Sequence, residues 1–153
     1  AVTAANAILS LAPGSAGPGL VSDMVGDRSI LDLSDNVIRP YYRQRVKQAV
    51  SWVNTALEGY PCRVHTPEGA IFLWLWFEGL PITSEKLYQR LKSRGVLVIA
   101  GEHFFPGLEG EWGHRHECIR ISYAQDPASV EAGIHIIGEE VARAYDSAKA
   151  KSV

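Results

Sequence analysis

The sequence predicts an α+β fold: a small mixed or antiparallel sheet of about four strands packed against helices, with one long connecting helix. Two patterns predict it. Apolar residues recur at helical spacing over residues 35–57 and 127–145, whereas residues 70–77 form an almost wholly apolar run of strand length. At 153 residues, with 46% hydrophobic and 21% charged residues, the chain has the size and composition of one ordinary core.

The first part of the chain is expected to be helical with one interruption. Residues 1–12 have the pattern of a helix remnant, and the Pro- and Gly-rich residues 13–19 predict a loop. A further helix is expected over about residues 20–26, and the long helix over about residues 35–57. Pro40 falls near the start of the long helix, where proline is tolerated; an earlier start would predict a kink there.

The remainder of the chain alternates short strands with two helices. The apolar run at residues 70–77 is expected to be a central strand covered on both faces. Helices are expected over residues 84–94, ended by Gly95, and from Pro127 onward, because proline suits the first turn of a helix. The other strands are expected at residues 62–65, 96–99 and 118–123.

Charge and composition exclude several function classes. The net charge is −2 and the basic residues form no block, so we expect neither a nucleic-acid partner nor a membrane surface. No apolar run is long enough to cross a bilayer, and the N-terminal residues lack the basic leader of a signal peptide. Cys62 and Cys118 are expected to stay reduced, which favours the cytoplasm.

Arg120 is the most informative single residue. It lies in the middle of an expected strand, between Ile119 and Ile121. A guanidinium keeps its charge, so a buried arginine needs an anionic partner, and its planar fork suits a carboxylate held by paired hydrogen bonds. We interpret Arg120 as the clamp for a substrate carboxylate; the alternative is an ion pair with a core carboxylate such as Glu68 or Asp126.

A metal site is the second chemical possibility in the sequence. His114, His116 and Cys118 alternate along the chain near His103, and these residue types bind zinc. No further ligand is evident beside them, so we interpret the segment as a polar surface loop and predict no metal site.

An aromatic alternation marks the strand at residues 70–77. Phe72, Trp74 and Trp76 share one face of it. A stacking platform for a base or ring is one interpretation. Packing in the core of a buried strand is the favoured one.

Three segments in fixed order carry a family resemblance. They are residues 67–74 (Pro-Glu-Gly-Ala-Ile-Phe-Leu-Trp), residues 95–101 followed by Phe104, and residues 120–123 (Arg-Ile-Ser-Tyr). Together they resemble the C-terminal, small-domain part of a fold-type I, pyridoxal-phosphate-dependent aminotransferase. Residues 67–77 and 104–108 most closely resemble the valine–pyruvate type.

The resemblance implies a role for several residues. It implies that Arg120 holds the α-carboxylate of small amino and keto acids, with Gly69, Phe104 and Phe105 bordering the site; for the two phenylalanines plain packing stays open. The implied activity transfers an amino group between valine or alanine and a 2-keto acid such as pyruvate. A cytoplasmic homodimer is implied for the full-length enzyme.

The resemblance also implies that the catalytic half precedes Ala1. A pyridoxal-phosphate enzyme needs a Schiff-base lysine, and none of the lysines of this chain sits on the turn where the family keeps it. We therefore expect no catalytic and no cofactor-binding residue in this chain, which alone would be inactive and bind no cofactor. The chain also lacks an initiator Met and begins inside a helical pattern, so we expect a piece of a longer protein.

The expected division of the chain follows from this. Residues 1–34 would be the edge of the missing large domain, residues 35–59 the connecting helix, and residues 60–153 the small domain. The rival hypothesis is a non-catalytic module related to aminotransferases, which senses a ligand or mediates association within a regulator.

Overall fold

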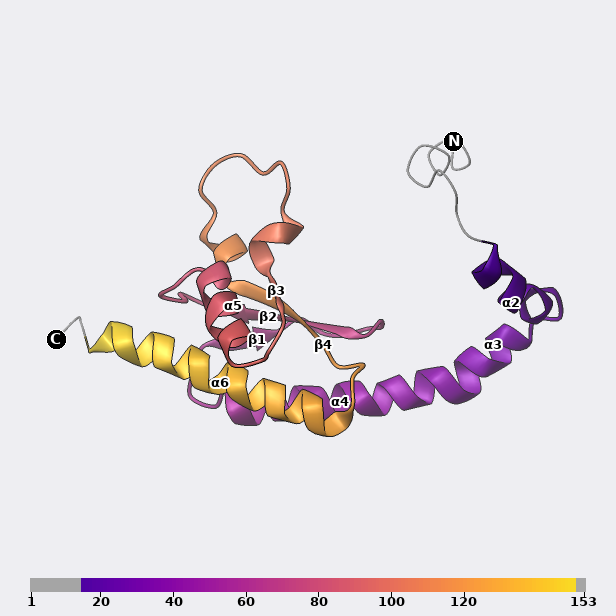
Figure 1. Cartoon of the computed structure of the whole chain (residues 1–153). Helices are drawn as coiled ribbons and strands as arrows, with labels where there is room; N and C mark the ends of the chain where they lie inside the picture. The colour runs from indigo at the N-terminus through magenta and orange to yellow at the C-terminus, as the bar shows by residue number, and fades with distance from the viewer. Residues whose placement is uncertain (1–14, 151–153) are drawn as a thin grey trace. The chain divides into compact units, whose positions relative to one another are not determined.

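The computed structural model describes residues 15–150, so the helix expected over residues 1–12 lies outside the described part. The chain forms two compact units, Ala1–Tyr41 and Tyr42–Val153. Figure 1 shows the helices and strands of both units. Within residues 15–150, no helix combines the length and the apolar character that crossing a bilayer requires.

The described residues of the first unit are helical. Helix α2 spans Ala16–Gly26 and α3 spans Ser29–Leu33. The helix expected at residues 20–26 is therefore confirmed, but the loop expected at residues 13–19 is wrong from Ala16 onward. Pro18 lies in the first turn of α2, where its missing N–H removes no helical hydrogen bond, so the Pro- and Gly-rich stretch does not prevent a helix there.

The expected long helix is present, with an irregular turn before it. A π-helical turn, η1, spans Ser34–Ile38, and α4 follows directly over Arg39–Ala56. Pro40 lacks an N–H, and its ring crowds the carbonyl four residues earlier in a regular α-helix. The π turn ends at Ile38, two residues before this proline, and it includes Asn36, whose carbonyl the ring would crowd in a regular helix.

The second unit contains one antiparallel sheet of four strands in the order β1-β2-β4-β3. The strands are β1 Cys62–Val64, β2 Phe72–Phe77, β3 Ile99–Ala100 and β4 Cys118–Ser122. The predicted sheet is confirmed, but β2 and β3 begin later than expected. Ala70 has a left-handed backbone, with φ 61°, which no strand residue adopts.

Two further helices complete the second unit: α5, Ser84–Ser93, and α6, Pro127–Lys149. The Thr83 hydroxyl caps α5 by accepting from the Lys86 N–H, and the Asp126 carboxylate caps α6 by accepting from the Ser129 N–H. Gly95, at φ 81°, follows α5 as expected.

The core lies on one face of the sheet. Leu73, Leu75 and Phe77 of β2 point into it and are fully buried. The helices α4, α5 and α6 supply the opposing side chains, which include Val53, Leu87, Leu91, Ile134, Ile137 and Val141. The expectation that β2 is covered on both faces is only partly met, because Phe72 on the other face is 38% exposed.

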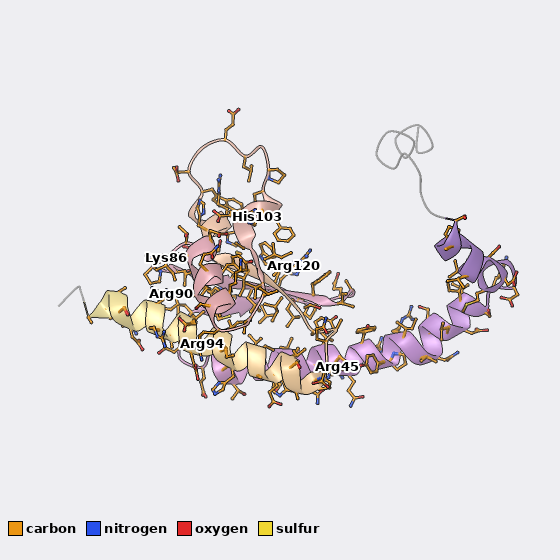
Figure 2. All side chains as sticks on the ribbon, viewed as in Figure 1. Arg45, Lys86, Arg90, Arg94, His103 and Arg120 are labelled. Atoms are coloured by element: carbon orange, nitrogen blue, oxygen red, sulfur yellow. The ribbon has the colours of Figure 1, made fainter. Side chains whose placement is uncertain are left out.

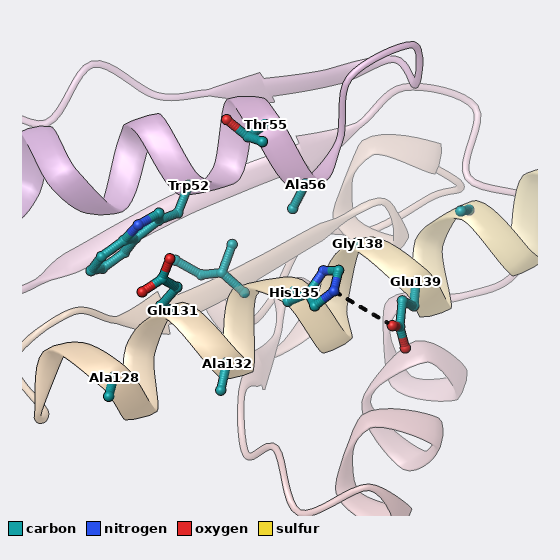
Figure 3. Close-up of a pocket in the computed structure, with 11 residues that line it drawn as sticks. Trp52, Thr55, Ala56, Ala128, Glu131, Ala132, His135, Gly138 and Glu139 are labelled. Atoms are coloured by element: carbon teal, nitrogen blue, oxygen red, sulfur yellow. Dashed lines mark ion pairs between the residues drawn. The ribbon is translucent and has the colours of Figure 1, made fainter.

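Helices α4 and α6 lie side by side in the second unit and leave an open groove of about 710 Å³ between them (Figure 3). At one end of the groove the two backbones approach closely. A Cβ on Gly138 would lie 2.5 Å from the Ala56 carbonyl oxygen, so only glycine fits at that crossing.

Candidate functional site

Arg120, labelled in Figure 2, lies at the centre of β4, and its register partners are Trp74 of β2 and Ile99 of β3. Its neighbours Ile119 and Ile121 point into the core. Because side chains alternate along a strand, Arg120 points to the other face of the sheet. It is half-buried there, so the candidate site lies on the sheet face away from the three helices.

Two phenylalanine rings contact the guanidinium of Arg120. Its Cζ lies 4.1 Å from the ring centroid of Phe72 and 4.9 Å from that of Phe104, over both ring faces. Phe72 is the first residue of β2, and Phe104 ends the 3₁₀ turn η2, Gly101–Phe104. The site is therefore built from three segments, β2, η2 and β4, which the sheet brings together.

No carboxylate neutralises Arg120 within the described residues. Among residues 15–150 its side chain takes part in no ion pair or hydrogen bond to protein. The Asp126 carboxylate instead accepts from the N–H and the hydroxyl of Ser129. The alternative that Arg120 pairs with Glu68 or Asp126 finds no support in this part of the chain, and the guanidinium keeps its donors available.

The aromatic residues of β2 lie on this face and not in the core. The Trp74 ring meets Phe104 edge-on at 5.1 Å between centroids and Phe105 at 6.0 Å. The indole N–H of Trp76 donates to the Glu117 carboxylate at 2.8 Å. The shared face of the three aromatics was predicted correctly, but their favoured place in the core was wrong, because Leu73, Leu75 and Phe77 occupy it.

The segment from Gly101 to His116, which carries Phe104, is fixed at both ends. The turn before it needs glycine, because a Cβ on Gly101 would lie 2.7 Å from the Cys118 carbonyl oxygen. The Glu102 carboxylate lies 2.8 Å from the His116 ring, in the 3₁₀ turn η3 (Gly113–His116), and so ties the two ends of the segment together.

The loop before β2 is tied to the end of β4. The Tyr123 hydroxyl donates to the Ala70 carbonyl at 2.6 Å, and Arg45 of α4 donates to the carbonyls of Gln125 at 2.7 Å and Tyr123 at 3.4 Å. Gly69 is exposed in this loop, and nothing lies within 4 Å of a Cβ placed on it. The strained residue that Tyr123 holds is Ala70, which the sequence alone did not mark.

The histidine and cysteine side chains near the site make pairwise contacts. The Cys118 sulfur lies 3.5 Å from the His114 ring, and burial raises the pKa of this thiol to about 11, so it stays protonated. Within residues 15–150, no group of three or more His, Cys, Asp or Glu side chains is placed to hold a metal ion.

The described lysines do not fit the role of a Schiff-base residue. Four described lysines are exposed: Lys47 of α4, Lys86 of α5 (labelled in Figure 2), Lys92 of α5 and Lys149 of α6. A lysine becomes a nucleophile at neutral pH when burial or a neighbouring cation lowers its pKa, and exposure provides neither burial nor a dry pocket. No lysine among residues 15–150 therefore has the buried surroundings that this role requires.

Known proteins resemble the chain over nearly its whole length. It is 49% identical over 145 residues to the valine–pyruvate aminotransferase of Escherichia coli, a match that covers 95% of this chain and 35% of the relative. By this homology, the chain matches the C-terminal part of fold-type I, pyridoxal-phosphate-dependent aminotransferases. It spans about a third of the length of the relatives it matches.

Solved aminotransferase structures agree with this homology. The valine–pyruvate aminotransferase of Salmonella typhimurium matches 95% of this chain with 37% of its own, at 49% identity and a TM-score of 0.84. A protein of Psychrobacter arcticum assigned as an amino-acid aminotransferase matches 95% of this chain with 33% of its own, at 46% identity and a TM-score of 0.86. The fold is that of the aminotransferase C-terminal domain. No protein-family model matches the chain.

Proposed function

We propose that this chain is the C-terminal part of an aminotransferase of the valine–pyruvate type, and that Arg120 holds the α-carboxylate of the amino and keto acids. One observation carries the proposal. A half-buried guanidinium lies over two aromatic rings with no acidic partner among residues 15–150. Such a cation is matched best by a planar carboxylate that accepts two hydrogen bonds.

The contribution of this chain is binding and orientation. Holding the carboxylate at one end of the substrate fixes the position of the α-carbon, and correct placement of reacting groups supplies a large share of enzymatic rate enhancement. Pyridoxal phosphate would serve as the electron sink when bound. Its lysine and phosphate-binding residues would belong to a preceding large domain, so the chain alone is expected to bind no cofactor and to be inactive.

We also propose the domain boundaries, the oligomeric state and the cellular compartment of the protein. Residues 1–34 would be the edge of the large domain, residues 35–59 the connecting helix, and residues 60–153 the small domain of a homodimeric enzyme. Cys62 and Cys118 are both free thiols, which fits a reducing compartment and supports the cytoplasm.

Substitution of Arg120 in the full-length protein tests the proposal. Arg120→Ala is expected to raise the KM for valine and for pyruvate by about tenfold or more, and Arg120→Lys to recover little, because lysine lacks the planar fork. Arg63→Ala is a matched control. Arg63 of β1 also lies over a ring, that of Trp76 at 5.7 Å, but it is paired with the exposed carboxylate of Glu78. Unchanged KM values in both Arg120 variants would refute the proposal.

The coding sequence before Ala1 separates this function from its rival. The proposal expects a turn there that carries a lysine next to Ser or Thr. A DNA-binding segment, or another residue in place of that lysine, would favour a non-catalytic module.

A further inference from the structure

Two aromatic rings from separate segments converge on the one arginine proposed to bind substrate. Phe72 enters from the start of β2 and Phe104 from the turn after β3, and both place a ring face within 5 Å of the Arg120 Cζ (4.1 and 4.9 Å). Both side chains are 38% exposed although they are large and apolar. These two rings are therefore not fully buried at this position, but both contact the cation.

Ring faces stabilise a guanidinium without occupying its N–H groups. The negative face of the π system attracts the cation electrostatically, whereas the donors of the guanidinium point outward in its own plane. An internal carboxylate would also stabilise the cation, but it would accept the hydrogen bonds that a substrate needs. Arg94 shows that second arrangement in the same fold, because its donors are taken by Glu139 and Glu140.

Phe104 is held in place from behind by a side chain of the sheet. Trp74 is the register partner of Arg120 on the neighbouring strand, and its ring meets Phe104 edge-on at an interplanar angle of 90°. This geometry is a favourable one for two aromatic rings. The same tryptophan therefore sits beside the arginine and supports the ring that covers it.

We propose that Phe72 and Phe104 are positioning residues that hold the Arg120 guanidinium by its faces and keep its donor edge free for a carboxylate. This inference rests on the proposed role of Arg120. It adds that the two rings increase the preference of the site for a carboxylate over an uncharged amide of the same shape. A guanidinium that turned freely would discriminate less between the carboxylate and the amide.

Leucine and tyrosine substitutions in the full-length protein test the pair. Phe72→Leu and Phe104→Leu keep an apolar side chain but remove the ring face. Each is expected to raise the KM for both substrates about tenfold, with a smaller change in kcat, whereas Phe72→Tyr and Phe104→Tyr stay within about twofold of the parent. Tyr88→Leu is the matched control, because its ring lies beside Lys92 of α5 and makes no contact with Arg120.

Binding of an unreactive pair of ligands separates positioning from general damage. Calorimetry compares 3-methylbutanoate with 3-methylbutanamide, and the leucine variants are expected to lose most of the preference for the acid while their unfolding temperature changes no more than that of Tyr88→Leu. Leucine variants that keep the parent KM and the parent preference would overturn the inference. If Arg120→Ala raises KM in the same experiments, only the role of the rings fails; if Arg120→Ala is also without effect, the proposed function fails with it.

Discussion

Three arginines of the second unit show how surroundings decide what a guanidinium can do. Arg45 is 5% exposed and donates to backbone carbonyls, and Arg94 is paired with two glutamates. Arg120 has aromatic faces beside it instead. Donors that already have acceptors inside the protein hold the fold together, whereas donors without one are available to a ligand. The surroundings of Arg120 therefore support its proposed role in binding a carboxylate.

Tyr145 gives the fold a testable pH dependence. Its hydroxyl donates to the Glu78 carbonyl at 2.9 Å, and burial raises its pKa from 10.0 to about 12. Between these values the unfolded chain loses a proton that the folded chain keeps, so the free energy of unfolding falls as pH rises through this range. Tyr145→Phe is expected to flatten the fall, and urea unfolding at a series of pH values measures it.

Cys62 supplies a control for that experiment. Burial raises the pKa of this thiol from 9.0 to about 12, so its own contribution to stability is lost over a window that begins at lower pH. Cys62→Ala should therefore remove the fall that begins below pH 10 and reduce the fall above it, where the contribution of Tyr145 remains. An unchanged slope in Tyr145→Phe would show that the hydroxyl is equally accessible in both states.

At the scale of elements, the strands and helices could largely be predicted from apolar periodicity, and their ends could not. Strand β2 starts two residues late because Ala70 takes a left-handed backbone, which a tyrosine distant in sequence holds by its hydroxyl. Helix α2 starts early because its proline falls in the first turn. The starts of β2 and α2 both depend on backbone geometry, which the pattern of apolar residues does not indicate.

The crossing of α4 and α6 yields a prediction with a built-in control. Gly138→Ala would place a Cβ 2.5 Å from the Ala56 carbonyl oxygen, so it is expected to lower the free energy of unfolding by about 1–3 kcal/mol despite the better helix propensity of alanine. Gly133→Ala, on the same helix, has only Val96 within reach, at 4.0 Å, and is expected to raise stability by about 0.5–1 kcal/mol. Thermal unfolding measures both.

A Gly138→Ala variant as stable as Gly133→Ala would contradict this prediction. If Gly138→Ala were as stable as Gly133→Ala, the two helices would have to separate by several tenths of an ångström at little cost. The close approach at Ala56 would then not be what holds α6 against α4.

At the scale of the whole molecule, the first unit exposes apolar side chains that a soluble monomer normally buries. Leu20 is 81%, Val25 57% and Leu31 58% exposed. The chain on its own is therefore expected to self-associate with rising concentration, which sedimentation velocity detects. The double variant Leu20→Ser and Leu31→Ser should reduce association, whereas Leu97→Ser, 73% exposed in the second unit, should not. A chain that stays monomeric at all concentrations would contradict this.

The candidate site was only half predictable, for a physical reason. A charged residue between apolar neighbours on a strand marks Arg120 directly. The two faces of β2, by contrast, are equally apolar in sequence: Phe72, Trp74 and Trp76 on one, Leu73, Leu75 and Phe77 on the other. Which face meets the helices is decided by the register with β4, where Leu73 and Leu75 lie opposite the buried Ile121 and Ile119. Phe72 could therefore not be assigned to the arginine from the pattern of β2 alone.

A crystal structure of the full-length protein with 3-methylbutanoate bound would show directly whether Arg120 holds the carboxylate. Each carboxylate oxygen is expected to lie about 2.7–3.0 Å from a nitrogen of Arg120, with Phe72 and Phe104 still against the guanidinium. A carboxylate held by other groups, with Arg120 turned into solvent or paired with an acid of the protein, would contradict it.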